Sequence, residues 1–251
     1  MKSLKQKLSD CELTIGSWLT IGNTATTEIM AKAGFDWLTI DLEHSAITLS
    51  EAQKLLQVIE LSGVTPLVRV GSNDPVIIKR VMDAGAHGII IPMVNTQEDA
   101  VAAVEFAYYP PKGKRGVGLA RAQNYGLGFK AYKKWLDEEC VVIVLIEHIE
   151  AIENLEAILS VEGIDGSIIG PYDLSASLGF PGEYDRPEVQ NAINVYRETC
   201  KRLGKPAGFH VVPSEAEMLK EKEKEGYSFL GFSLDSLFLG NKIKEQLDMV
   251  K

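Results

Sequence analysis

Short apolar runs alternate with longer amphipathic stretches along the whole chain. The runs are rich in β-branched residues, which is typical of strands buried on both faces, and between them apolar residues recur at helical spacing. The expected strands are Thr14–Leu19, Trp37–Asp41, Thr65–Val70, Gly88–Met93, Val141–Ile146, a run that ends at Gly170, Ala207–Val211 and Phe229–Leu234. Strands that alternate with helices in this way predict a parallel sheet.

Helix-start and helix-stop signals stand between these runs. Asp74-Pro75 places proline at the first position of a helix, and Gly85 suits the end of that helix. We expect Ser214 with Glu217 to form a capping box before the last strand. Eight strands, each followed by a helix and without a linker, predict one (β/α)8 TIM-barrel domain over residues 1–251.

One segment breaks the alternation. Residues 108–128 contain Pro110, Pro111 and several glycines, together with polar side chains such as Arg115 and Arg121. We expect a long irregular loop there, and such loops are usually functional or disordered.

Composition and charge narrow the classes of partner. The chain has 251 residues and a net charge of −9, with acidic residues spread over the predicted surface helices. This argues against nucleic acid or an anionic membrane as a partner. No apolar run could span a bilayer, and no signal-peptide core follows the charged N-terminus. The three cysteines (Cys11, Cys140 and Cys200) are widely spaced, which argues against a disulfide framework or structural zinc. We therefore expect a cytoplasmic protein.

Polar residues gather where several predicted strands end. They are Asp41, Glu43 and His44 after the second strand, Arg69 in the third, Glu147 after the fifth and Asp173 after the sixth. The carboxyl ends of barrel strands meet at one rim, which is where barrel enzymes carry their active sites. We therefore expect these side chains to converge.

The residue types at this rim indicate metal-assisted chemistry. Glu147 and Asp173 follow adjacent strands, so their carboxylates can share Mg²⁺ or Mn²⁺, with Co²⁺ as a further option. The remaining metal positions suit a 2-oxo acid whose keto oxygen becomes an enolate. Arg69 would face the developing charge, and backbone N–H groups around Gly170-Pro171-Tyr172-Asp173 would hold the carboxylate. His44 is the natural proton carrier.

Several of these residues also have a structural interpretation. Asp173 equally suits a helix N-cap, and Arg69 equally suits a structural ion pair. Glu147 has no comparable local explanation, because a glutamate that ends an apolar strand is costly unless it is paired. His210 lies near the end of the seventh strand, where we expect it behind the substrate-contacting residues. His87 precedes the fourth strand and belongs to the opposite rim.

Seven short motifs, in order over essentially the whole chain, together resemble the HpcH/HpaI aldolase family. They are Gly16-Ser17-Trp18, Asp41-Leu42-Glu43-His44, Leu67-Val68-Arg69-Val70, Ile91-Pro92-Met93, Gly113-Lys114-Arg115-Gly116, Ile146-Glu147 and Gly170-Pro171-Tyr172-Asp173-Leu174-Ser175. The resemblance implies a class II (metal-dependent) pyruvate aldolase, which cleaves a 4-hydroxy-2-oxo acid to pyruvate and an aldehyde. By position it implies Glu147 and Asp173 as metal ligands, Arg69 as the group that stabilises pyruvate, and His44 in acid–base catalysis.

The resemblance also implies a homo-oligomer. Family members are typically hexamers (trimers of dimers) that exchange terminal helices, which fits the apolar final helix of this chain. Asp83 falls where the family places an acidic partner for the histidine across a subunit contact, so the expected catalytic residues are His44, Arg69, Asp41 and Asp83. Leu145 is a departure, because aldolases of the group often carry glutamine there; this puts the usual dicarboxylate or sugar-acid substrate in doubt.

Two other functions stay open at this point. One is an acyl-CoA lyase of the related citrate-lyase branch, although the acidic chain shows no basic stripe for nucleotide phosphates. The other is a non-catalytic oligomeric scaffold or ligand sensor.

Overall fold

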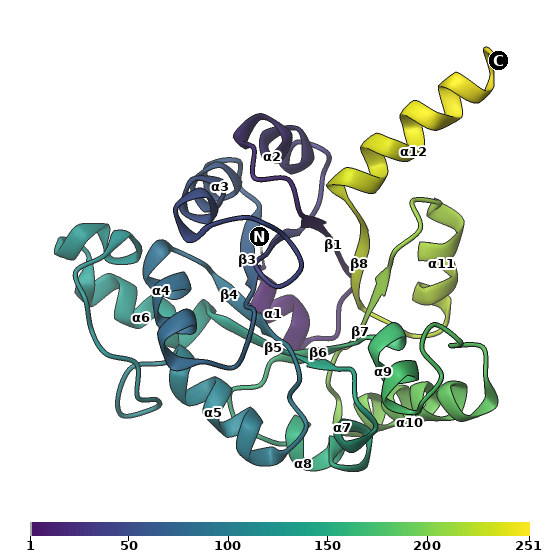
Figure 1. Ribbon diagram of the computed structural model, residues 1–251. Coiled ribbons are helices and arrows are strands. Elements are labelled where there is room, and N and C mark those ends of the chain that lie inside the picture. Colours follow the sequence, from purple (N-terminus) through teal and green to yellow (C-terminus); the bar gives the residue numbers. More distant parts are fainter. Residues whose placement is uncertain (1) are drawn as a thin grey trace.

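The eight strands of the computed structural model, which describes residues 2–251, close into a parallel barrel in chain order (Figure 1). They are β1 (Thr14–Leu19), β2 (Trp37–Asp41), β3 (Thr65–Arg69), β4 (Gly88–Ile91), β5 (Val141–Ile146), β6 (Gly166–Ile169), β7 (Ala207–Val211) and β8 (Phe229–Leu234). β8 pairs in parallel with β1 and so closes the ring. The predicted (β/α)8 barrel is confirmed.

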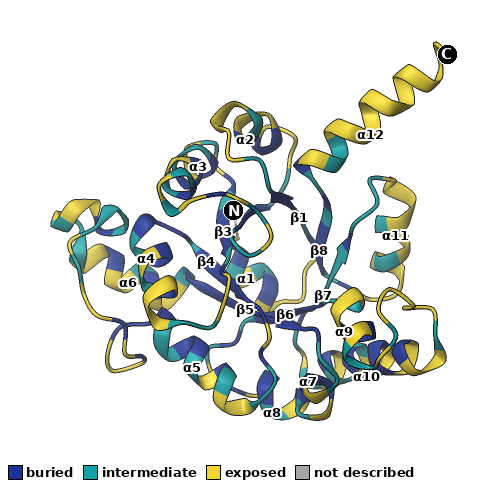
Figure 2. Cartoon of the chain, viewed as in Figure 1, coloured by how far each residue is buried: buried dark blue, intermediate teal, exposed yellow. Residues whose placement is uncertain are grey.

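Helices surround this barrel and cover its outer face. They are α2 (Thr24–Ala31), α3 (Leu49–Leu61), α4 (Pro75–Ala84), α5 (Gln97–Ala107), η1 (Arg121–Gly126), α6 (Phe129–Glu139), α7 (Ile149–Glu153), α8 (Leu155–Leu159), α9 (Pro171–Ser177), α10 (Pro187–Leu203) and α11 (Ala216–Lys224), and the last helix is α12 (Asp235–Asp248). Their outer faces are exposed while the strands are buried, as expected for a sheet covered by helices (Figure 2). The segment 108–128, expected to be irregular throughout, contains the 3₁₀ turn η1.

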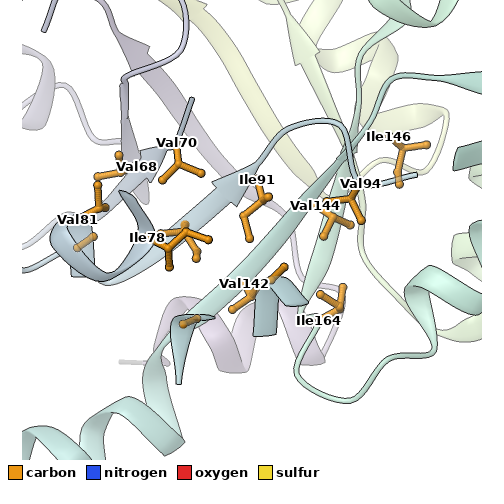
Figure 3. Packing of buried hydrophobic residues seen from close by; sticks show 14 of the residues in the cluster. Val68, Val70, Ile78, Val81, Ile91, Val94, Val142, Val144, Ile146 and Ile164 are labelled. Atoms are coloured by element: carbon orange, nitrogen blue, oxygen red, sulfur yellow. The ribbon is translucent and has the colours of Figure 1, made fainter. Parts of the chain in front are cut away.

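The alternation of side chains along each strand divides the apolar residues into two clusters. On β5, Val142 and Val144 point outward and pack with residues such as Ile164 beneath the helices (Figure 3). Ile143 and Leu145 point into the barrel and belong to a separate inner cluster. Because Glu147 follows the same phase as these two residues, the geometry of β5 aims it at the barrel mouth.

A short helix that the sequence analysis did not predict closes the amino end of the barrel. Helix α1 (Leu4–Ser9) begins with a capping box between Ser3 and Gln6. Its buried side chains Leu4 and Leu8 join the inner cluster. The helix is too short to show helical periodicity in sequence, and its place is set by contact with the barrel interior.

The predicted helix ends were partly right. Asp74 caps α4, and Gly85 ends it in the left-handed conformation with a φ of 107°. The Ser214–Glu217 capping box is wrong: α11 begins after Glu215 and has no side-chain cap. The Ser214 hydroxyl instead accepts a hydrogen bond from Asn241 Nδ2 on α12 at 3.0 Å.

Helix α12 projects away from the barrel (Figure 1). It exposes large apolar side chains, among them Leu239, Ile243 and Leu247, which recur every four residues and so share one face. Within residues 2–251, we find no helix with the length and apolar character needed to traverse a lipid bilayer.

Candidate active site

Arg69 is the last residue of β3 and lines the mouth at the carboxyl end of the barrel. Its Cα pairs with that of Asp41 across β2 and β3, so both side chains point inward at the same level. Nε donates to Asp41 Oδ1 at 2.9 Å and Nη2 donates to Asp41 Oδ2 at 2.7 Å. The guanidinium also lies 4.6 Å from the centre of the Trp18 ring and 3.3 Å from a Glu43 oxygen. The fork geometry fixes the cation in one orientation.

Asp41 holds Arg69 and also shapes the loop that follows β2. Its side chain is buried, and Oδ1 accepts the backbone N–H groups of Glu43 at 3.0 Å and His44 at 3.2 Å. Burial works to raise the pKa of Asp41, but the hydrogen bonds and charge of Arg69 outweigh it, so the pKa lies below its usual value. Asp41 therefore stays ionised and positions the residue that carries the candidate imidazole.

Glu147 is a nearly buried acid at the same mouth, with 6% of its surface exposed. Oε1 accepts the backbone N–H of Met93 at 2.8 Å. Burial raises the pKa of Glu147 to about 7, and the negative charges of Glu43 and Asp173 add to the rise. A carboxylate crowded by two others in a low-dielectric site is stabilised by a cation.

Asp173 completes this group and does not act as a helix cap. Helix α9 has Gly170 at its N-cap position and no side-chain cap, so the N-cap interpretation of Asp173 is wrong. The side chain is exposed in the first turn, and no hydrogen bond to it occurs among the described residues. A Cβ at Gly170 would lie 3.0 Å from Glu147 Cβ, so glycine there lets the β6 tip approach Glu147.

These two acids suit a cation with few protein ligands. Residues 2–251 contain no group of three or more histidine, cysteine or acidic side chains arranged to hold a metal. Mg²⁺ and Mn²⁺ do not need such a group, since they commonly take one or two carboxylates and keep water or substrate in the other positions. Glu147 and Asp173 therefore fit a divalent ion of this kind.

A cavity of about 590 Å³ opens beside the acids. The lining side chains that matter for the chemistry are Trp18, Arg69, Leu145, Glu147, Asp173 and His210. Leu145 is buried in its wall, so the polar contact expected from glutamine is absent. This volume is within the range of small-molecule sites.

The two remaining predicted catalytic residues lie differently. His44 is at the edge of the mouth, with 66% of its side chain exposed and Nε2 3.6 Å from Glu43 Oε2. Asp83 is on α4, outside the barrel wall, where Gly118 and the charge of Arg115 are its neighbours. The fold of one chain thus brings His44 to the acid cluster and leaves Asp83 apart from it.

Two contributors were underrated from the sequence. Trp18 appeared only as part of a motif, yet it supports the Arg69 guanidinium. Glu43 was placed at the strand tip without a role, yet it contacts Arg69 and repels Glu147. The alternation along β1 could have predicted the position of Trp18. Gly16 faces the barrel interior, where Trp37 packs against it, and Trp18, two residues later, faces the same way.

A closed parallel barrel with a fixed arginine among carboxylates at its carboxyl end defines a barrel enzyme with its site in the usual place. The chain belongs to the HpcH/HpaI aldolase/citrate lyase family, whose model matches residues 14–240. The resemblance seen in the sequence is confirmed.

Relatives of known name support the same grouping. The chain is 40% identical to a 4-hydroxy-2-oxovalerate aldolase of Rhodococcus jostii over 96% of this chain and 93% of the relative. It is 38% identical to a hydroxypyruvate/pyruvate aldolase of Sagittula stellata over 90% and 88% of the two chains. A crystal structure of a family member from Burkholderia cenocepacia superposes with a TM-score of 0.93 at 31% identity, covering 98% of each chain.

Proposed function

We propose that this protein is a class II aldolase, a carbon–carbon lyase that reversibly cleaves a 4-hydroxy-2-oxo acid into pyruvate and an aldehyde. The observation that carries the proposal is the burial of Glu147 beside the fixed Arg69, which raises the pKa of Glu147 to about 7, with the negative charges of Glu43 and Asp173 adding to the rise. Acids held this way are common where a cation and a developing anion are to be bound. The aldolase names of the relatives point to the same reaction.

Glu147 and Asp173 would hold the divalent cation, Mg²⁺ or Mn²⁺, with Co²⁺ as an alternative. When bound, the cation supplies Lewis acidity at the keto group of the oxo acid. Oε2 of Glu147 has no hydrogen-bond partner among the described residues, because the hydrogen bond from the Met93 N–H goes to Oε1. The ion would relieve the repulsion between the two carboxylates.

The chain's own groups would bind and orient the substrate. Arg69 is fixed by Asp41 and would lie against the negative charge that develops on the keto oxygen. The N–H groups of Tyr172 and Asp173 belong to the first turn of α9, where no helical acceptor exists, and would hold the carboxylate at the Gly170-Pro171 turn. His44 would carry the proton of the C4 hydroxyl at Nε2, directly or through water.

We extend the proposal to assembly and location. Residues 1–251 would act as one barrel domain in a cytoplasmic homo-oligomer, a hexamer built as a trimer of dimers. The apolar face of α12 supports exchange of this helix between subunits. In such an assembly Asp83 of a second copy would accept a hydrogen bond from His44, which the fold of one chain does not allow.

Proton exchange tests the reaction without knowledge of the aldehyde. Pyruvate is incubated in D₂O with the protein and Mn²⁺ or Mg²⁺, and incorporation of deuterium into its methyl group is followed by mass spectrometry. We expect exchange that stops with EDTA and is lost in Glu147→Gln, while Glu28→Gln, an exposed acid on α2, behaves as wild type. Absence of exchange with every metal would overturn the proposal and favour a non-catalytic homologue. Thioester cleavage without pyruvate exchange would favour the acyl-CoA lyase.

A further inference from the structure

His210 is a residue of the cavity wall for which the proposed reaction has no use. Its ring packs against the Trp18 ring, with 5.2 Å between the centroids and 46° between the planes. β8 runs between their two strands and carries Gly231 at this level, where a Cβ would lie 3.0 Å from Trp18 Nε1 and 3.3 Å from His210 Cδ2. Glycine thus makes room for both rings, and His210 faces the cavity rather than the helices.

The hydrogen bonds of His210 determine which nitrogen carries the proton. Nε2 lies 3.1 Å from the Ser233 carbonyl oxygen, which can only accept, so Nε2 is the donor. Burial lowers the pKa of His210 to about 4, with a further contribution from the charge of Arg69, so the imidazole is neutral near pH 7. Nδ1 therefore carries a lone pair, and no described residue donates a hydrogen bond to it.

The inner wall next to β7, below the acids, is apolar. Leu145 and Ile168 are paired across β5 and β6, and each is buried. They lie two residues before Glu147 and Gly170, so they share the inward phase and lie one level below the acid group. Both line the cavity that His210 also lines. Phe209 pairs with Ile169, so His210 is level with Gly170 and lies one level above this apolar pair.

We propose that His210 is a specificity-determining residue, which accepts at Nδ1 a hydrogen bond from a hydroxyl on C3 of the donor 2-oxo acid. The donors favoured would be 3-hydroxy-2-oxo acids, in which C3, the carbon that forms the new bond, carries an oxygen. This inference rests on the proposed function, because it assumes that the oxo acid binds between Arg69 and the two acids. Leu145 and Ile168, one level below His210, would give C3 an apolar floor.

A comparison of two donors that differ by one hydroxyl tests the assignment of His210. Pyruvate and hydroxypyruvate are each condensed with propanal as the common acceptor in the presence of Mn²⁺, and kcat/KM is measured for each donor. The wild-type protein is expected to use hydroxypyruvate at least as well as pyruvate. If pyruvate condenses and hydroxypyruvate does not, this inference is wrong while the proposed function stands. If neither donor condenses and pyruvate shows no proton exchange, the proposed function itself fails.

Two variants separate the lone pair of His210 from its ring. His210→Phe keeps an aromatic ring against Trp18 and removes the acceptor, and we expect kcat/KM for hydroxypyruvate to fall about tenfold relative to pyruvate. His210→Asn keeps an acceptor near the position of Nδ1 and is expected to retain most of the preference. His87→Phe is the matched control, since His87 lies against Trp135 at the other end of the barrel.

The ratio of the two donors distinguishes selection from a structural role. Equal losses for both donors in His210→Phe would show that His210 only supports Trp18 and Arg69, and would overturn the assignment. Unchanged kcat/KM values for both donors would also overturn the assignment. If His210→Phe does not fold, as judged by circular dichroism, His210→Leu makes the same comparison with a smaller side chain.

Discussion

Arg69 and Asp41 are joined at two points, with both carboxylate oxygens receiving a hydrogen bond from the guanidinium at 2.9 and 2.7 Å. The sequence left open whether Arg69 is a structural ion-pair partner or a ligand for substrate. The geometry makes these roles compatible, because the pair occupies one edge of the guanidinium while the residue also lines the cavity. The ion pair therefore orients the Arg69 guanidinium for substrate binding and does not prevent that binding.

Arg69→Lys is expected to lower the rate of pyruvate proton exchange by about a hundredfold, because an ammonium cannot reproduce the two parallel bonds to Asp41. Incorporation of deuterium into pyruvate at saturating Mn²⁺, followed by mass spectrometry, measures the effect. Arg80→Lys, an exposed arginine on α4, should exchange at the wild-type rate. If Arg69→Lys retains more than half of the wild-type exchange rate, the two parallel hydrogen bonds from Arg69 to Asp41 are not needed for the reaction.

Binding of Mn²⁺ is expected to weaken as the pH falls below about 7. Glu147 must lose its proton to bind a metal, and its pKa in the metal-free protein is about 7. Isothermal titration calorimetry between about pH 5.5 and pH 8.5 should show up to a tenfold loss of affinity per pH unit on the acid side. Glu43→Gln removes one source of repulsion and should move this transition to lower pH. An affinity that does not change over the range would count against Glu147 as a ligand.

Glu147→Gln is expected to stabilise the metal-free protein at pH 8. The folded-state pKa of Glu147 is raised from 4.5 to about 7, so its contribution to stability is present below pH 4.5 and is lost as the pH rises toward 7. The loss amounts to at most about 3 kcal/mol, which the neutral glutamine avoids.

Urea denaturation with EDTA present measures this effect. The free energies of unfolding of the variant and wild type should differ at pH 8 and converge near the usual glutamate pKa of about 4.5. Glu28→Gln should show no such pH-dependent gain, since Glu28 is exposed. If the variant is less stable than wild type at pH 8, the ionised Glu147 carboxylate does not destabilise the folded protein.

Leu8→Ala is expected to destabilise the protein by about 2–5 kcal/mol, because Leu8 on α1 is fully buried in the inner cluster. The free energy of unfolding in urea measures the change. Leu127→Ala serves as the control, since Leu127 is almost fully exposed and should change stability little. A negligible effect at Leu8 would mean that α1 does not close the barrel in solution.

Ile243→Glu is expected to reduce the mass of the assembly. Ile243 lies in the middle of the exposed apolar face of α12, and a charge there could not be buried against a neighbouring subunit. Light scattering after size-exclusion chromatography reports the mass. Lys244→Glu changes the charge of the adjacent exposed residue and should leave the assembly intact if the apolar face is what matters. An Ile243 variant of unchanged mass would exclude this face as a subunit contact.

The alternation of apolar runs and helical stripes was enough to predict the barrel. Each strand is buried on both faces, as at β5, where Val142 faces the helices and Ile143 faces the interior. A strand of this kind has a continuous apolar run whose limits are readable locally. The position of Glu147 at the mouth followed from the same periodicity, since one residue more or less would have turned it outward.

The environment of the acids was decided only by the closed barrel. Burial in the mouth of the barrel raises the pKa of Glu147, and Glu43 and Asp173, which come from other strand ends, add to the rise, so no local sequence pattern predicts it. The same holds for the packing of His210 against Trp18, which joins strands from opposite ends of the chain. The sequence by itself determined the elements and the rim at which polar side chains emerge, because periodicity is a local property. The tertiary structure alone decided charge, burial and hydrogen-bond partners, because these depend on residues that become neighbours only when the ring of strands closes.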